Sequence, residues 1–536
     1  MNVKDIVRLS TRILNLIFWM ILAYLTGDLG MGFYYIAFIA FELLIIIFAG
    51  GIKQSVARMV AVRKSKGLHY NSKLIFRYGI FYSLITGALI GFALWSLSGT
   101  LYRHILGYIL PESVLSVLSV YFVIHSLRGC LQGYYQGIGD TLICIVAEVV
   151  QAVAQIVLCP ILVIRMYGYG MKVSGLLKNP MYANINGTIG GVMAQCIAGI
   201  ICILVLVIGD RIAGKVFRQE YNSVKGVDNR RNITLSFIKS SALYIVEKIT
   251  PILTIVVILT IFVKKAYAND VDIKELFTGI GVFAGKYLIV LGFLLAFFFE
   301  YSDRECKKIR ADFGREENKT VRARISYLIK NSALILIPLS LLVIILAKPI
   351  VMIFFDGRMS LGVTLLRQGG IVVLFAGICH MCKSALSAVK LTKFSYLGNL
   401  IGFAVAVLTA VGVSGNGSDI TMLVLSYTTG YFAEAVFLLF ILYMMRFYDP
   451  MDIGIRCAKI LAAAAVFAGV LAILDHFIVM NALFLVLTIL IAYGAYVVTL
   501  AVIKGITLRD INSLKGTLIY YPIVFVGRIF VDRYNK

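Results

Sequence analysis

Charged residues are scarce in this chain of 536 residues. Asp, Glu, Lys and Arg together make up 15% of it, whereas hydrophobic residues make up 60% and the mean hydropathy is +0.92. A soluble globular domain carries about 25% charged residues. The bilayer accommodates apolar surface that a soluble core cannot absorb. The composition therefore excludes a soluble enzyme and a nucleic-acid-binding protein, and it predicts an integral membrane protein.

Signatures of several other protein classes are also missing. The apolar run after Lys4, Arg8 and Arg12 is followed by no small-residue cleavage site, so we interpret it as a first span and not as a signal peptide. The nine cysteines lie mostly in apolar stretches and do not indicate a disulfide framework. No zinc-protease, kinase or nucleophile-elbow motif is present. We expect no enzymatic activity and no cofactor.

One metal-like spacing occurs, at Cys379-His380-Met381-Cys382. It lies inside an apolar run, and no second pair of ligands accompanies it. A structural zinc site needs four such ligands. We therefore predict no metal site.

Long apolar runs are abundant, and they predict an all-α membrane protein with about 14 transmembrane helices. The predicted spans are 12–27, 31–51, 75–98, 114–137, 141–164, 188–208, 234–263, 276–300, 330–355, 368–388, 393–413, 420–445, 457–476 and 480–503. The gap at 27–32 is a tight glycine-rich turn, and 165–187 is predicted to be an external loop.

The basic residues are distributed unevenly over the predicted loops. Lys and Arg number 51 against 27 Asp and Glu, a net charge of +24. With the N-terminus inside, 37 of the 51 fall in cytoplasmic segments, 10 in external loops and 4 within spans. Cytoplasmic loops retain an excess of Lys and Arg. We predict a multi-pass protein of the cell membrane with both termini in the cytoplasm, where the basic face attracts anionic lipid headgroups.

A faint internal repeat divides the chain. The basic stretch that follows Gly50 and Gly51 recurs after Glu300, and the close turn near Gly139 recurs near Lys390, each about 250 residues later. Six helices per repeat give both halves the same orientation, related by an axis along the membrane normal. The predicted parts are lobes at 1–210 and 230–446, two further helices at 457–503 and a cytoplasmic tail at 504–536.

Charges deep in the predicted spans are the candidate functional residues. Each costs roughly 2.5–3.5 kcal/mol on insertion scales, so it persists only when it is paired or faces a wet cavity. The cations considered for substrate binding are Lys286, Arg128 and Lys248. The acids considered for binding a coupling ion, or for ion pairs, are Glu42, Glu148, Glu247 and Glu434.

Two of these cations have alternatives that the sequence leaves open. Arg128 and Glu148 lie at similar depth on either side of the turn near Gly139, so they either form a salt bridge or line a cavity. Lys286 has no obvious partner on its own helix, so it either contacts an anion or pairs with Glu247 or another acid.

The segment from Arg128 to Gly137 carries glycines at positions 129, 133 and 137. This spacing places the three glycines on one face of a helix, which permits the close approach of another helix. We predict that the face serves packing, with hinge motion as the alternative.

Two stretches resemble a known family. Residues 25–34 (LTGDLGMGFY) with 48–52 (FAGGI), and Leu127-Arg128-Gly129 through Gln136-Gly137, resemble the polysaccharide-transport exporters of the multidrug/oligosaccharidyl-lipid/polysaccharide flippase superfamily. Their stage V sporulation protein B-like and lipid II flippase-like members are the most similar. The resemblance extends over essentially the whole chain.

The resemblance implies a V-shaped pair of six-helix lobes that alternate between inward- and outward-open states. It implies an undecaprenyl-pyrophosphate-linked saccharide as substrate and partner, with a groove for the polyprenyl tail at 457–503. The chain departs from the lipid II flippases at two cavity arginines, whose positions fall at Phe18 and at Ile45 or Ile46 here, whereas Lys286 matches a basic position.

We therefore expect a flippase of lipid-linked saccharides, driven by the membrane potential or an ion gradient. The alternatives are a multidrug/cation antiporter of the same superfamily and a membrane polymerase or ligase that acts on lipid-linked sugars. The sequence does not indicate an oligomeric state.

Overall fold

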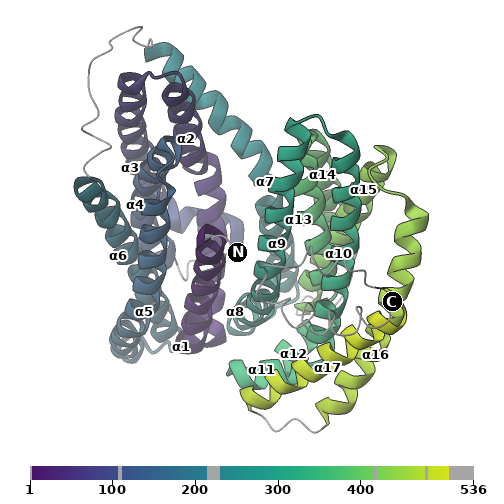
Figure 1. Ribbon diagram of the computed structural model, residues 1–536. Helices are drawn as coiled ribbons and strands as arrows, with labels where there is room; N and C mark the ends of the chain where they lie inside the picture. The colour runs from purple at the N-terminus through teal and green to yellow at the C-terminus, as the bar shows by residue number, and fades with distance from the viewer. Residues whose placement is uncertain (1–2, 107–111, 214–229, 414–418, 477–480, 506–536) are drawn as a thin grey trace. The chain divides into compact units, whose positions relative to one another are not determined.

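The computed structural model describes residues 3–106, 112–213, 230–413, 419–476 and 481–505, and this part of the chain forms helices throughout (Figure 1). The helices are α1 (Val3–Phe48), α2 (Gly50–Ser65), α3 (His69–Leu106), α4 (Glu112–Ile138), α5 (Thr141–Leu177), α6 (Met181–Ala213), α7 (Arg230–Ala268), α8 (Ile273–Val282), the π-helix η1 (Phe283–Leu288), α9 (Ile289–Gly314), α10 (Asn318–Ile345), α11 (Ala347–Phe354), α12 (Met359–Gly369), α13 (Val372–Ala388), α14 (Thr392–Gly412), α15 (Thr421–Met444), α16 (Pro450–Asp475) and α17 (Ala482–Val502).

The number of membrane spans agrees with the prediction. Among the described residues, 12 helices are long and apolar enough to cross a membrane, or 13 when the bent pair α12 and α13 counts as one span. One of the 12 is the continuous stretch Ile6–Ser65, whose 60 residues rise about 90 Å, far more than a hydrocarbon core of about 30 Å requires. This stretch holds two spans, so the prediction of an all-α membrane protein with about 14 helices is confirmed.

The two spans within that stretch are separated by a break at Gly27. Its φ of 69° and ψ of 177° lie outside the helical region and suit a residue without a Cβ. Asn184 Nδ2 donates to the carbonyl of Thr26 at 2.8 Å, and Thr188 Oγ1 donates to the carbonyl of Gly30 at 3.0 Å. The predicted turn at 27–32 is therefore a kink at a single residue, and two side chains of α6 bind carbonyls beside it.

The glycine face of α4 packs against α2, as predicted. A Cβ at Gly133 would overlap the carbonyl of Lys53, and one at Gly137 would lie 2.8 Å from the carbonyl oxygen of Ala57. Figure 1 shows α2, α3 and α4 side by side. The close approach matters for function because it brings the backbone of Lys53 against the helix that carries Arg128.

The predicted external loop at 165–187 is wrong. α5 continues to Leu177 and α6 begins at Met181, so only residues 178–180 lie between the two helices. Glycines allow this extension, because a Cβ at Gly170 would lie 2.7 Å from the carbonyl oxygen of Tyr182. α5 is about 55 Å long, and it therefore extends beyond the hydrocarbon core.

The chain divides into two compact units, Ile6–Gly285 and Lys286–Lys536, the second of which includes Met1–Asp5. α7 and α8 belong to the first unit, where α7 packs on α2 and α3. This division lies later in the chain than the boundary between the predicted lobes 1–210 and 230–446. Of the predicted tail at 504–536, residues 506–536 lie outside the described part.

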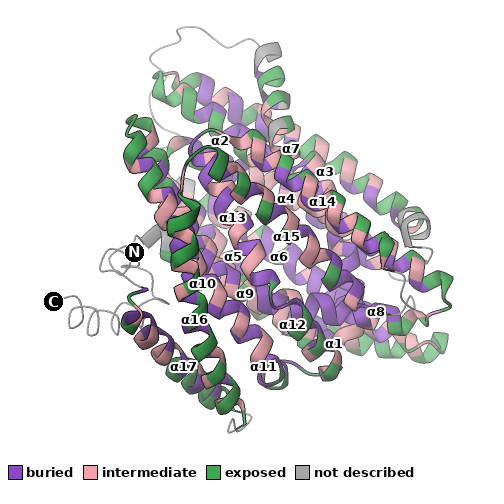
Figure 2. Ribbon diagram, turned by 90° about the vertical axis from the view of Figure 1, so that its right-hand side faces the viewer, coloured by how far each residue is buried: buried purple, intermediate pink, exposed green. Residues whose placement is uncertain are grey.

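In the second unit, α16 and α17 correspond to the predicted helices at 457–503. Tyr496 of α17 donates a hydrogen bond to the carbonyl of Leu334 at 3.0 Å, and Lys330 of α10 forms an ion pair with Asp452 of α16. Much of both helices is exposed (Figure 2). The exposed residues include the apolar side chains of Leu461, Ile473 and Leu483. Such faces suit contact with lipid, because hydrocarbon solvates them.

Candidate functional site

A cavity of about 720 Å³ lies within the first unit. Its volume is within the range of about 300–1,000 Å³ that is typical of small-molecule sites. Side chains of α1, α2, α4, α5, α6 and α7 line it. The polar ones include Thr11, Asn15, Glu42, Lys53, His125, Arg128, Gln132, Glu148, Gln151, Gln155, Gln195 and Lys248.

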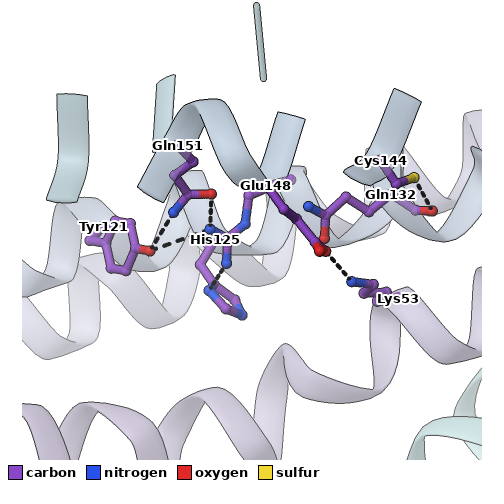
Figure 3. Close-up of polar contacts among 8 residues, drawn as sticks. Lys53, Tyr121, His125, Gln132, Cys144, Glu148 and Gln151 are labelled. Atoms are coloured by element: carbon purple, nitrogen blue, oxygen red, sulfur yellow. Dashed lines mark hydrogen bonds and ion pairs between the residues drawn. The ribbon is translucent and has the colours of Figure 1, made fainter. Parts of the chain in front are cut away.

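Arg128 is held in this cavity by neutral groups. It donates from Nη1 to Gln151 Oε1 at 2.5 Å and to the hydroxyl of Tyr121 at 3.5 Å, and from Nη2 to His125 Nδ1 at 2.9 Å (Figure 3). Its Nε is buried without a hydrogen bond. Among the described residues, no carboxylate forms an ion pair with this guanidinium. The positive charge is fixed in position and has no direct counter-charge.

Glu148 instead forms an ion pair with Lys53, with Nζ and Oε1 3.0 Å apart (Figure 3). Both side chains are about one-third exposed and line the cavity. Of the two alternatives for Arg128 and Glu148, the structure shows the second: the two residues form no salt bridge with each other, and both lie on the cavity wall. The physical reason is the close packing of α2 on α4, which brings a competing ammonium group to Glu148.

Two further predicted residues line the cavity. Glu42 extends from α1 and forms no hydrogen bond or ion pair with any described residue. Lys248 extends from α7, and its side chain is exposed. The lining therefore holds three cations, Lys53, Arg128 and Lys248, against two carboxylates, and its formal charge is positive.

The remaining predicted residues lie elsewhere. Lys286 is in η1, is only 2% exposed, and lies with its Cδ close to Gly362 of α12. It is not among the residues that line the cavity. Glu434 of α15 is buried, and its Oε1 lies 2.7 Å from Lys383 Nζ, which also donates to Asn399 Oδ1 at 3.1 Å. The side chain of Glu247 lies outside the described part of the structure.

Two residues of the segment 379–382 in α13 contact groups other than a metal ion. His380 Nε2 lies 3.0 Å from Asp303 Oδ1, and Cys379 Sγ donates to the carbonyl of Tyr431 at 3.3 Å. Within the part of the chain that the structure describes, no three His, Cys, Asp or Glu side chains are grouped so that they could hold a metal ion.

Several cavity residues were not predicted. Lys53 belongs to the segment 52–77, which is predicted to be a cytoplasmic loop, and no signal in the sequence indicated His125. Glutamines 132, 151, 155 and 195 also line the cavity, and all four lie within predicted spans. Uncharged amides in apolar runs are a usable signal, because each needs hydrogen-bond partners that hydrocarbon does not supply.

Comparison with known families gives one match. Residues 6–254 match the model of a family described as polysaccharide biosynthesis protein. This range contains every residue that lines the cavity, from Thr11 to Ile252. No curated protein matches the chain by sequence.

Solved structures with a similar fold are membrane transporters. A lipid II flippase, MurJ, in an inward closed conformation has a TM-score of 0.64 and 16% identity, covering 93% of this chain and 97% of its own. An inward-facing multidrug resistance MATE family transporter of the MOP superfamily has a TM-score of 0.61 and 14% identity, covering 83% and 98%. A MOP superfamily transporter from Pyrococcus furiosus has a TM-score of 0.54 and 14% identity, covering 83% and 93%. At these identities the likeness shows the fold alone.

Proposed function

Because residues 6–254 of this chain match the model of the polysaccharide biosynthesis protein family, we propose that the protein is a membrane flippase of undecaprenyl-pyrophosphate-linked saccharides. The resemblance predicted from the sequence is thereby confirmed, and the chain has the fold of MOP superfamily transporters. We further propose that it works by alternating access and that its cargo is a precursor of a polysaccharide or of peptidoglycan. The transport step makes and breaks no covalent bond, so the proposal assigns the chain no enzymatic role.

Arg128 carries this proposal. A diphosphate that crosses hydrocarbon needs donors and positive charge to replace its water. A guanidinium that is hydrogen-bonded to Gln151, His125 and Tyr121 supplies both, since no carboxylate among the described residues forms an ion pair with it. Arg is suited to phosphate oxygens because its planar group donates two parallel hydrogen bonds. The diphosphate would bind at Arg128, with Lys248 supplying further positive charge from α7.

The glutamines of the cavity suit the saccharide. Gln132, Gln155 and Gln195 line the same cavity as Arg128. Their amides both donate and accept hydrogen bonds, as sugar hydroxyls require. The cavity thus combines a site for an anion with neutral groups for a glycan.

The alternative functions receive less support. A multidrug/cation antiporter needs net negative charge around its cargo, whereas the lining of this cavity holds two carboxylates, Glu42 and Glu148, against three cations. A polymerase or ligase of lipid-linked sugars needs catalytic groups, and the solved structures that share this fold are transporters by their descriptions. We therefore favour an anionic, lipid-linked cargo.

Energy for transport would come from the membrane potential or an ion gradient without a cofactor. Of the proposed coupling residues, Glu42 is the one that faces the cavity without an ion pair to a described residue, whereas Glu148 and Glu434 are paired with lysines. Glu247 stays a prediction from the sequence.

We propose that the chain lies in the cell membrane with both termini in the cytoplasm, as the 37 basic residues of the cytoplasmic segments indicate. Those residues would also attract anionic lipid headgroups. A reporter enzyme that is active only outside the cell, fused after Lys536, should be inactive. Activity of that fusion would show that the C-terminus lies outside the cell and would contradict the proposed orientation.

The binding proposal is tested with geranyl diphosphate, a short probe that carries a prenyl-linked diphosphate without the saccharide. Calorimetry on the full-length protein in detergent should show binding, and Arg128→Gln should weaken it about tenfold to a hundredfold, as for the loss of a hydrogen bond to a charged group. Lys286→Gln, measured in parallel, distinguishes the contribution of Arg128 to binding from that of Lys286, the other candidate anion contact. Equal affinity of Arg128→Gln and the wild type, at equal melting temperatures, would remove Arg128 from the site.

A further inference from the structure

The hydrogen bond between Arg128 and His125 fixes the protonation state of the histidine. The guanidinium has donors and no acceptor, so the atom it contacts at 2.9 Å, His125 Nδ1, must accept. An accepting Nδ1 carries no proton, which leaves the proton of the neutral imidazole on Nε2. In the arrangement that the structure shows, His125 is therefore uncharged.

The surroundings of His125 also favour the neutral form. α3 meets this part of α4 through small residues, since a Cβ at Gly91 would lie 3.0 Å from the carbonyl oxygen of Ser119 and one at Gly87 would lie 3.2 Å from Val123 Cα. Among the described residues, no carboxylate forms an ion pair with His125. The charged and titratable groups that line the cavity or interact electrostatically with Arg128 are Tyr121 and Arg128 on α4, Lys53 on α2, Glu148 on α5, Glu42 on α1, Cys202 on α6, and Lys248 and Tyr244 on α7.

An anion bound at Arg128 would instead favour the protonated form of His125. Its oxygens would take over guanidinium donors, so that Nδ1 of His125 is released from its role as acceptor. Its negative charge would offset that of Arg128, and it would offer an acceptor to a protonated imidazole. A histidine in that position can then bind a proton from water and donate to the anion.

We propose that His125 is a proton-binding site that is loaded together with the anionic headgroup at Arg128. The inference rests on the proposed function for its class of ligand, a diphosphate. One proton from the solvent adds to Nδ1 when the anion binds, and it leaves when the anion is released. The protein would thus carry one proton with each headgroup, which reduces the net negative charge that crosses the membrane.

Linkage gives the sign of the pH dependence. When binding of an anion takes up a proton, the affinity for the anion rises as the pH falls, by at most tenfold per pH unit for one proton. A variant that cannot protonate at position 125 loses this dependence and keeps only that of the probe.

Calorimetry in buffers of different ionisation enthalpy counts the protons taken up. The full-length protein in detergent is titrated with geranyl diphosphate at several pH values near neutrality, and His125→Asn is titrated in the same way. The Asn carbonyl accepts a hydrogen bond from Arg128 but binds no proton, so this variant reports the titration of the probe itself. We expect the wild type to take up as much as one proton more than His125→Asn.

The matched control is His69→Asn at the exposed start of α3, which should take up as many protons as the wild type. His125→Gln provides a second neutral variant if the Asn variant melts early. An equal proton count in the wild type and a folded His125 variant overturns the inference while the binding proposal stands. No binding of the probe by the wild type at any pH overturns both.

Discussion

At the scale of single residues, the ion pair between Lys53 and Glu148 sets the electrostatics of the cavity. The two charges offset each other, which leaves Arg128, Lys248 and Glu42 as the other charged side chains of the lining. The pair is about one-third exposed, and pairs of this kind contribute little to stability. Its main effect is therefore on the affinity for a charged ligand.

Breaking this pair from either side should change anion binding in opposite directions. Glu148→Gln leaves the charge of Lys53 uncompensated and should raise the affinity for geranyl diphosphate about two- to tenfold, the scale of one charge at close range in a partly hydrated site. Lys53→Met leaves Glu148 uncompensated and should lower it by a similar factor. Calorimetry at low and high salt measures both, and changes of the same sign would contradict this account.

The sequence was informative about which charges matter and much less about their partners. Arg128, Glu148, Glu42 and Lys248 were identified because a charge within an apolar run is costly, and all four line the cavity. The partner of Glu148 could not be identified from the sequence, because Lys53 is 95 residues away and lies just past the predicted end of a span. Proximity of that kind depends on helix packing, which local sequence does not encode.

At the scale of helices, the glycine face of α4 positions the cavity wall. Gly133 lies against the carbonyl of Lys53, so it fixes the distance between α2 and α4 at the level of the ion pair. The spacing of glycines 129, 133 and 137 was enough to predict a packing face, because a 3.6-residue period places them together. The identity of the partner helix was not predicted.

Gly133→Ala should destabilise the protein, whereas Gly129→Ala should not. The added methyl at position 133 overlaps backbone atoms of Lys53, which we expect to cost about 1–3 kcal/mol as overpacking does. At position 129 the nearest atoms lie 3.9 Å from the added carbon, an ordinary contact. Thermal unfolding in detergent measures both, and equal melting temperatures for the two variants would refute the packing role.

The ends of the helices were harder to predict than their spans. Hydropathy located the apolar run at 141–164, but α5 continues to Leu177 because α6 packs along it beyond the apolar segment. Small residues at the contact, such as Gly170, allow that packing. Polar sequence outside the bilayer is ambiguous between loop and helix, since tertiary contacts decide the outcome.

At the scale of the whole molecule, composition determined the class of the protein. The low charge content and the apolar runs predict a multi-pass membrane protein, and the described helices agree. The faint repeat predicts a boundary between residues 210 and 230, and contacts between helices group α7 and α8 with the preceding helices. We interpret the net charge of +24 chiefly as a topological signal, because only three of the Lys and Arg side chains among the described residues line the cavity.

The central claim is that this cavity carries a lipid-linked saccharide across a membrane with Arg128 as the contact to its diphosphate. The most direct test is translocation of a fluorescent undecaprenyl-pyrophosphate-linked oligosaccharide in liposomes that contain the purified protein. We predict transfer well above that of protein-free liposomes, and transfer about tenfold slower or more with Arg128→Gln. Transfer by the wild type no faster than in protein-free liposomes would contradict the account.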